Sequence, residues 1–370
     1  MTSNPYRSAL LAVVTLACVG WLALSARRPA HAVSAATPTV AAPIAIKVVV
    51  VANFEKGADL GDAPGEYQDW VEREHLNEIV PVRGAANILR RNREGLYGLI
   101  PRQGTADFSA FLLDPHFDLR KTYWVFTGIS GIDPKAGTVG DAAWARWVIN
   151  GDELHEVDDR ELPAGWPYGL WAIGANRPNE LPVKDVNGKK LIAVTHREMA
   201  YDLNQGLARW AFHMTKDVPL GENRNLLGLP RERWNGFPQA QREPKVMMGE
   251  TLGCVRYWHG ASRTRWAEDW TRLWTGGKGT FVMTNMESQT YERLALIFAG
   301  NGLLDKNRVM VLRTASNFSQ SAPGQNFQDE TGDEPGQVLA FDSNERAGIP
   351  VIHELLTHWS KYENSIPSAP

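Results

Sequence analysis

The chain is poor in cysteine, has no surplus of positive charge and contains a single long apolar run. Cys18 and Cys254 are the only cysteines in 370 residues, which excludes a disulfide framework and a zinc site built from cysteines. Its 39 basic and 42 acidic side chains give a net charge of −3, which excludes a nucleic-acid binder that relies on bulk positive charge. The 43% of hydrophobic and 22% of charged residues are typical of a globular protein.

The long apolar run lies near the N-terminus, at residues 9–26, between Arg7 and the pair Arg27-Arg28. Small residues on both sides of His31 offer a signal-peptidase site, so we expect residues 1–32 to be a signal peptide that directs the protein to the periplasm or outside the cell. The run also approaches the length of about 20 residues that spans a bilayer, so a retained membrane anchor stays open. A single span cannot form a solute pathway by itself, which excludes a self-sufficient channel.

Short apolar runs in the rest of the chain predict buried strands. The β-branched run at residues 46–51 is the clearest, because a strand covered on both faces reads as a continuous apolar segment. The other runs lie at residues 123–126, 142–149, 279–283 and 308–312.

Helical patterns alternate with these runs. Residues 263–275 carry Trp266, Trp270 and Trp274 four positions apart, which predicts a helix whose tryptophans pack in the core. Residues 350–362 begin with a proline, a residue favoured in the first turn of a helix. Strands that alternate with helices predict an α/β fold with three layers.

We expect one large domain over residues 46–362, after a linker at residues 33–45 and before a tail at residues 363–370. Residues 152–190 and 218–247 are rich in Pro, Gly, Asn and Trp and have no clear period. We expect them to leave the sheet as long excursions, of the kind that forms lids or walls of a site.

Polar clusters follow four of the predicted strands. In α/β sheets, ligands bind at the carboxyl ends of the strands, so four such clusters together predict a crevice site. Taken singly, Glu55 and Glu287 are equally well explained as solvated acids at strand ends. The clusters are residues 52–55, 127–131, 283–287 and 313–317.

Other kinds of site are disfavoured by the sequence. The histidines are scattered without the spacing of metal ligands, so we expect no metal site. No glycine-rich nucleotide-binding motif is present, so we expect no nucleotide cofactor. Ser130 has no evident His and Asp partners, which disfavours a serine hydrolase.

Four segments of the chain resemble the purine nucleoside permease family, which is similar to the nucleoside phosphorylases and methylthioadenosine nucleosidases. The likeness runs from about residue 46 to residue 362. It implies a nucleoside phosphorylase-like α/β/α sandwich with a central twisted mixed sheet, a purine nucleoside as ligand and a homo-oligomer. The segments are VVVVANFEKGADLGDAPGEYQDWVER, FDLRKTYWVFTGISGIDPKAGTVGDAAWARWVI, YWHG and RTASNF.

The resemblance also implies roles for individual residues. Met286 and Glu287 match the Met-Glu pair whose carboxylate holds the 2′- and 3′-hydroxyls of the ribose. Asn317 matches the position that grips the N7 edge of the purine. Ser130-Gly131 matches the loop beneath the ribose and phosphate, and Trp258 falls in the segment that contributes to the base pocket.

Two departures from the phosphorylase pattern favour water over phosphate as the nucleophile. Ile129 stands where phosphorylases place a phosphate-binding Ser, and the first strand is followed by Glu55, Lys56 and Asp59 without the phosphate-binding Arg. A carboxylate beside the anomeric carbon accepts a proton from water and repels phosphate. We therefore expect Glu55 to be a catalytic carboxylate of a hydrolase.

The amide of Asn317 favours a 6-oxopurine. It cannot deliver a proton as an Asp does, so we expect it to act at the base by hydrogen bonding. It donates one hydrogen bond and accepts another, which suits the O6 and N7–H of a leaving hypoxanthine or guanine. We therefore expect inosine or guanosine to be preferred over adenosine.

Two functions stay open, with phosphorolysis as a weaker third. In the first, the protein hydrolyses the N-glycosidic bond of purine nucleosides. In the second, it binds the nucleoside without turnover and passes it to a membrane transport partner. A carboxylate that faces the anomeric carbon from Glu55 or Asp59 distinguishes them, because a pure binder has no use for it.

Overall fold

The computed structural model describes residues 42–192, 198–224, 231–327 and 334–369. The predicted signal peptide and residues 33–41 of the predicted linker lie outside this part. Within the described ranges, no helix combines the length and the apolar character needed to cross a membrane.

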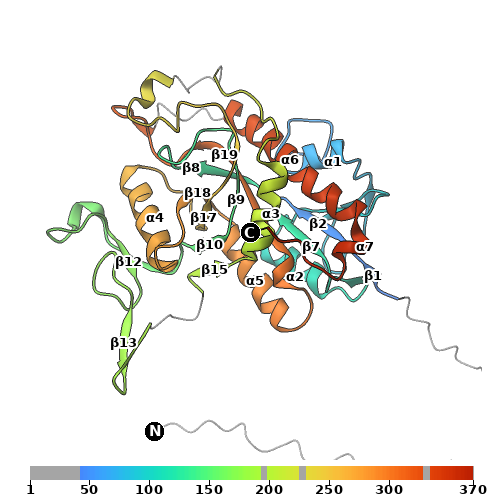
Figure 1. The fold of residues 1–370 in the computed structure, drawn as a ribbon, viewed down its shortest axis with the longest axis horizontal. Coiled ribbons are helices and arrows are strands. Elements are labelled where there is room, and N and C mark those ends of the chain that lie inside the picture. The colour runs from blue at the N-terminus through green and yellow to red at the C-terminus, as the bar shows by residue number, and fades with distance from the viewer. Residues whose placement is uncertain (1–41, 193–197, 225–230, 328–333, 370) are drawn as a thin grey trace, which may run out of the picture. The chain divides into compact units, whose positions relative to one another are not determined.

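A mixed sheet forms the centre of the fold (Figure 1). Its strands in spatial order are β15 (Ala200–Asp202), β10 (Trp147–Asn150), β17 (Glu250–Gly253), β18 (Phe281–Asn285), β8 (Ile129–Ile132), β19 (Val309–Phe318), β7 (Tyr123–Phe126), β2 (Val48–Val51), β5 (Leu96–Leu99), β4 (Leu89–Arg91) and β3 (Glu78–Ile79). β9 (Ala142–Trp144) pairs with β19, and β16 (Val246–Met248) pairs with β9. β2 is parallel to both of its neighbours, whereas β18 is antiparallel to β8.

β19 is the longest of these strands and joins the two halves of the sheet. Residues 309–311 pair with β7, and residues 314–318 pair with β8. On its other edge, residues 312–314 pair with β9. One strand therefore carries both a structural segment and the predicted polar cluster at residues 313–317.

Helices cover both faces of the sheet. The side chains of β2 alternate between two apolar clusters: Val49 and Val51 pack in one, and Val48 and Val50 pack in the other. The first cluster holds residues of α2 (Thr105–Leu113) and α5 (Ser288–Gly300). The second holds residues of α1 (Gln68–Arg73), α3 (Gln205–Thr215) and α6 (Glu334–Thr357). The predicted α/β fold with helices on both faces of a central mixed sheet is confirmed.

The tryptophan stripe lies on α4 (Ala261–Trp274). Trp266 and Trp270 are buried and belong to an apolar cluster with Ile149 of β10 and Leu252 of β17, with Trp274 packed against it. The predicted role of the stripe in core packing is confirmed.

The run at residues 142–149 is two strands rather than the single strand that its pattern predicts. The chain breaks between β9 and β10 because the carboxylate of the buried Glu250 accepts hydrogen bonds from the backbone N–H groups of Arg146 and Trp147, both at 2.9 Å. The guanidinium of Arg146 pairs with the same carboxylate. No pattern of apolar residues reveals this partner a hundred positions away.

The predicted helix start at residue 350 is wrong. α6 runs through Pro350, which lies inside the helix. A proline lacks the N–H that would bond the carbonyl four residues earlier. That carbonyl belongs to Arg346, an exposed residue, so water can replace the missing donor.

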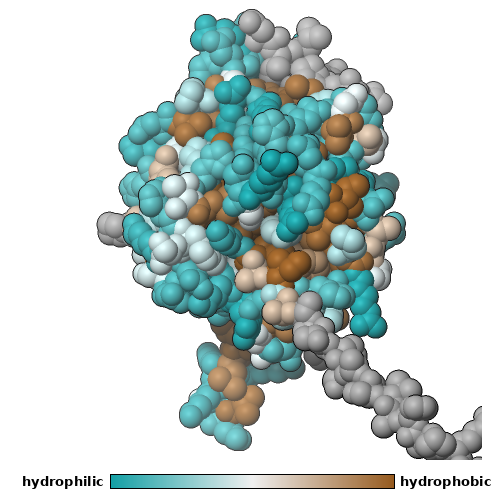
Figure 2. All heavy atoms as spheres, turned by 90° about the vertical axis from the view of Figure 1, so that its right-hand side faces the viewer, coloured by the Kyte–Doolittle hydropathy of each residue, from teal (hydrophilic) through white to brown (hydrophobic). Residues whose placement is uncertain are grey.

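Residues 152–190 leave the central sheet as predicted, whereas residues 218–247 return to it at Val246, the first residue of β16. β11 (Leu154–Glu156) pairs with β12 (Leu170–Ala172), and β13 (Val183–Val186) forms a hairpin with β14 (Lys189–Ile192) whose residues are all exposed. Figure 2 shows this hairpin below the main body, with apolar and polar side chains intermixed. The remaining elements are β1 (Ile44–Ala45), β6 (Phe117–Asp118), α7 (Trp359–Tyr362) and the 3₁₀ turns η1 (Asp159–Glu161), η2 (Arg231–Trp234) and η3 (Lys306–Arg308).

Candidate functional site

A cavity of about 270 Å³ lies where residues of β8, β18 and β19 meet. Its volume is close to the lower end of the range of about 300–1,000 Å³ that is usual for small-molecule sites. All four predicted polar clusters contribute to its lining, through Phe54, residues 129–131, residues 284–287 and residues 316–317. The structure therefore brings the four clusters to one site.

Most of the predicted site residues line this cavity, but one does not. The predicted residues in its wall are Ser130, Gly131, Trp258, Met286, Glu287 and Asn317. Glu55 is absent from the lining residues, and the carboxylate that lines the cavity together with Glu287 is that of Glu66.

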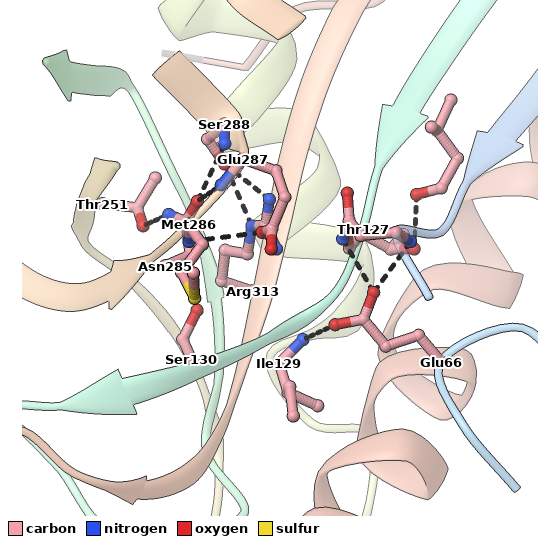
Figure 3. A network of polar contacts seen from close by, with 12 residues as sticks. Glu66, Thr127, Ile129, Ser130, Thr251, Asn285, Met286, Glu287, Ser288 and Arg313 are labelled. Carbon is pink, nitrogen blue, oxygen red and sulfur yellow. Dashed lines mark hydrogen bonds and ion pairs between the residues drawn. The ribbon is translucent and has the colours of Figure 1, made fainter. Parts of the chain in front are cut away.

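Glu66 is buried and held by three N–H donors. Its Oε2 accepts hydrogen bonds from the backbone N (2.8 Å) and the side-chain Nδ2 (2.7 Å) of Asn53, and its Oε1 accepts one from the backbone N of Ile129 (2.7 Å; Figure 3). A carboxylate offers about four lone-pair sites. These bonds therefore leave Oε1 able to accept one more hydrogen bond, at the wall of the cavity.

Burial raises the pKa of Glu66 to about 7, and the negative charge of Glu287 adds to this effect. The charge of Arg313 and the N–H groups of Ile129 and Asn53 oppose it. A carboxyl group with a pKa near 7 is half ionised at neutral pH, which suits proton transfer in either direction.

Glu287 is the second carboxylate and is held in place from two sides. The side chain of Asn285 accepts hydrogen bonds from the backbone N of Glu287 (3.0 Å) and of Ser288 (2.8 Å), which fixes the turn from β18 into α5. Nη1 of the buried Arg313 lies 3.3 Å from Oε2 of Glu287, and the guanidinium also donates to the hydroxyl of Ser288 at 2.7 and 3.0 Å (Figure 3). The arrangement presents an acceptor beside a fixed positive charge.

Gly128 allows these groups to approach one another. It has a φ of +143°, and a Cβ built on it would lie 2.3 Å from both Nη1 of Arg313 and Nδ2 of Asn53, and 2.8 Å from Oε1 of Glu66. Any other residue would therefore collide with the groups that hold the two carboxylates. The close approach predicted for the glycines of residues 127–131 is found here.

Asn317 presents an amide to the cavity from β19. Its Oδ1 accepts a hydrogen bond from the hydroxyl of Ser316 (2.9 Å), and its Nδ2 donates one to the carbonyl of Phe318 (2.9 Å). Because an amide has two donor hydrogens and two acceptor lone pairs, one of each remains for a ligand.

Two further residues of the wall offer contacts to a ligand, one through a hydroxyl group and one through an aromatic ring. The hydroxyl of Ser130 is buried and has no hydrogen-bond partner among the described residues, and an unpaired buried hydroxyl costs about 1–3 kcal/mol. Trp258 is buried against Trp266 and Phe281, with ring centroids 5.7 and 6.2 Å away, so its ring forms a fixed wall.

Neither of the acids expected near the reacting carbon faces the cavity. Asp59 is paired with Arg90 at 2.6 Å and also with Arg102. Glu55 accepts hydrogen bonds from backbone N–H groups of its own loop. Glu66 was missed because it lies between β2 and α1, and not directly after a strand.

Within the described ranges, no group of three or more His, Cys, Asp or Glu side chains could hold a metal ion. The side chains at the cavity instead suit a neutral ligand with hydroxyl groups. The carboxylates accept hydroxyl hydrogens, the amide reads an edge with both a donor and an acceptor, and the indole ring packs against a flat group.

A profile of the purine nucleoside permease family matches residues 45–367 of the chain. The chain is 28% identical over 256 residues to the probable purine nucleoside permease of Schizosaccharomyces pombe, an alignment that covers 68% of this chain and 72% of that one. It is 26% identical over 265 residues to the purine nucleoside permease of Candida albicans, covering 70% of this chain. The alignment spans 63% of the Candida protein's length.

Solved structures of hydrolases are also similar. The futalosine hydrolase of Helicobacter pylori aligns with a TM-score of 0.45 at 12% identity, over 84% of this chain and 99% of that chain. The 5′-methylthioadenosine/S-adenosylhomocysteine nucleosidase of Neisseria meningitidis aligns with a TM-score of 0.45 at 11% identity, over 84% and 100%.

Proposed function

Because the chain belongs to the purine nucleoside permease family, we propose that its cavity binds a purine nucleoside and that Glu66 promotes hydrolysis of the N-glycosidic bond. The observation that carries this proposal is that two carboxylates, Glu66 and Glu287, line one cavity with the amide of Asn317. One acid is enough to hold the ribose. A second, buried acid with a pKa near 7 can transfer a proton during a reaction, a role that binding alone does not need.

Glu287 binds the ribose in this proposal. Its carboxylate lies 3.3 Å from the guanidinium of Arg313, and a carboxylate accepts hydrogen bonds from both the 2′- and the 3′-hydroxyl. Each such bond to a charged acceptor contributes about 1.5–3 kcal/mol. The unpaired hydroxyl of Ser130 supplies a further polar contact.

Asn317 binds the base. Its free donor bonds O6 of a 6-oxopurine and its free acceptor bonds N7–H once the leaving base is protonated at N7, so inosine or guanosine is the preferred substrate. The ring of Trp258 packs against the flat base or sugar as a wall of the cavity.

Glu66 activates water. The remaining lone pair of Oε1 accepts a proton from a water molecule that attacks the anomeric carbon, while the bond to the base breaks and its electron pair leaves with the purine, which takes up a proton from solvent at N7. The sugar passes through a positively charged state, which two nearby carboxylates stabilise. The same charges repel phosphate, and the basic side chain in the wall, Arg256, is paired with Glu156 at 2.7 Å.

The test is to incubate the purified protein with inosine, with and without phosphate, and to measure hypoxanthine. Release without phosphate supports hydrolysis, and release that depends on phosphate supports phosphorolysis. The relatives named as permeases favour a second candidate, a binding component that passes the nucleoside to a membrane partner. Tight binding of inosine with no release in either buffer would support that candidate and refute both enzymatic ones.

We also propose that residues 1–32 direct export, with cleavage near Ala32. Sequencing the N-terminus of the protein from periplasm or medium tests this proposal. A mature chain that starts close to residue 33 supports it, and an intact N-terminus in the membrane fraction supports the anchor instead.

A further inference from the structure

The loop between β2 and α1 folds around the carboxylate of Glu55. Oε1 of Glu55 accepts hydrogen bonds from the backbone N of Lys56 (2.9 Å) and of Gly65. Oε2 accepts hydrogen bonds from the backbone N of Tyr67 (3.0 Å) and of Gln68 (2.7 Å). One side chain at the start of the loop therefore binds four backbone N–H groups, three of them at the loop's end.

These contacts lie on both sides of Glu66. Gly65 precedes it and Tyr67 follows it, and each is bound to a different oxygen of Glu55. The backbone N of Glu66 itself donates to the carbonyl of Phe54 at 3.1 Å. Hydrogen bonds on both sides of Glu66 therefore fix the position of its backbone, from which its side chain reaches the wall of the cavity.

Gly65 shows how closely the two ends of the loop approach. A Cβ built on Gly65 would lie 2.5 Å from Oε1 and 2.7 Å from Cα of Glu55. Only a residue without a side chain leaves room for this contact. Two features of the sequence, an acid at position 55 and a glycine at position 65, therefore both contribute to the contact between the two ends of the loop.

We propose that Glu55 is a positioning residue, whose carboxylate closes the loop and thereby holds Glu66 in the wall of the cavity. The proposal rests on the proposed function of the site, in which Glu66 activates water. It requires a carboxylate, because an ionised carboxylate only accepts hydrogen bonds. The amide of a Gln has one acceptor oxygen in place of two. Its NH₂ group would face two of the four backbone N–H donors and could not accept a hydrogen bond from either.

The test compares Glu55→Gln with Glu94→Gln, the same chemical change at an exposed position elsewhere in the chain. We expect Glu55→Gln to lower kcat for inosine by about 100-fold, the loss that a misplacement of about 1 Å can cause, with little change in KM. The acid limb of its pH profile should move below pH 7, because Glu66 leaves its buried position. A change that only loosens the fold would lower the melting temperature and leave the pH profile in place.

A second readout does not depend on turnover. The carboxyl carbon of Glu66 is followed by NMR in the full ¹³C-glutamate-labelled chain, and its signal is assigned by its loss in Glu66→Gln. A titration near pH 7 in the natural chain that moves to lower pH in Glu55→Gln supports the proposal even if inosine is not hydrolysed. The same titration in both proteins overturns it even if inosine is hydrolysed.

A third variant covers the case in which Glu55→Gln does not fold. Glu55→Asp keeps the charge and shortens the side chain by one methylene, so we expect a smaller shift of the Glu66 titration in the same direction. A Glu55→Asp protein in which the Glu66 titration and kcat equal those of the natural chain also overturns the proposal.

Discussion

Replacing Glu66 by Gln tests the chemistry assigned to the site. The substitution keeps the size of the side chain and removes its ability to accept a proton. Burial and the charge of Glu287 raise the pKa of Glu66 to about 7, so holding this side chain ionised costs about 3 kcal/mol more than in water. That cost makes Glu66 a better proton acceptor than an ordinary carboxylate at neutral pH.

The expected size of the effect follows from this role. We expect Glu66→Gln to lower kcat for inosine hydrolysis by about 10²–10⁴-fold, which is the usual contribution of a general base. In the natural chain, the ionised fraction of Glu66 falls from about a half at pH 7 to about a tenth at pH 6, so kcat/KM should fall about fivefold over that unit and about tenfold with each pH unit below 6.

The assay measures hypoxanthine release from inosine between pH 5 and pH 9, with inosine binding measured separately by calorimetry. Glu94→Gln serves as the matched control and should behave like the natural chain. Hydrolysis by Glu66→Gln at the natural rate would refute the reasoning, and so would a flat pH profile between 5 and 7.

Three further variants test other parts of the structure. Glu287→Gln should weaken binding of inosine much more than binding of its 2′,3′-dideoxy analogue, and equal losses measured by calorimetry would contradict the ribose contact. Burial raises the pKa of Glu292 to about 8, so the free energy of unfolding should fall by about 1.4 kcal/mol with each pH unit from its ordinary range up to about pH 8. Glu292→Gln should make the pH slope of the free energy of unfolding in urea shallower by this amount, while the slope that Glu66 contributes up to about pH 7 remains; an unchanged slope between pH 7 and pH 8 would contradict the buried carboxyl. Gly128→Ala should lower the melting temperature and abolish inosine binding, because its Cβ would collide with Arg313 and Asn53; a protein with natural stability and binding would disprove the close approach.

Much of the site could be predicted because its residues lie at or beside strands. Residues 46–51 and 123–126 read as buried strands, and β2 and β7 lie within those runs. Ser130, Glu287 and Asn317 lie on or directly after strands that meet in the sheet, so the topology brings them together. For such residues, a correctly predicted strand is nearly enough to show at which edge of the sheet the side chain lies.

The rest depends on contacts between distant residues. Glu55 and Glu66 lie in one loop, and only the closure of that loop decides which of them faces the cavity. In the same way, the break between β9 and β10 depends on Glu250, and the passage of α6 through Pro350 depends on the packing of the whole helix. Local patterns carry no information about these partners.

The shared strand β19 links the cavity to the far half of the sheet. Its end at Asn317 reaches the cavity, and its beginning at Val309 is hydrogen-bonded to β7, which makes no contact with that cavity. We therefore expect a ligand bound at Asn317 to oppose opening of the strand at Val309. Since a ligand at a hundred times its Kd stabilises the folded state by about 2.7 kcal/mol, inosine should slow amide exchange in β7 as well as around itself. Amide exchange in β7 would then report whether the cavity is occupied, although β7 does not touch the ligand. The same measurement applies to variants that bind inosine without hydrolysing it.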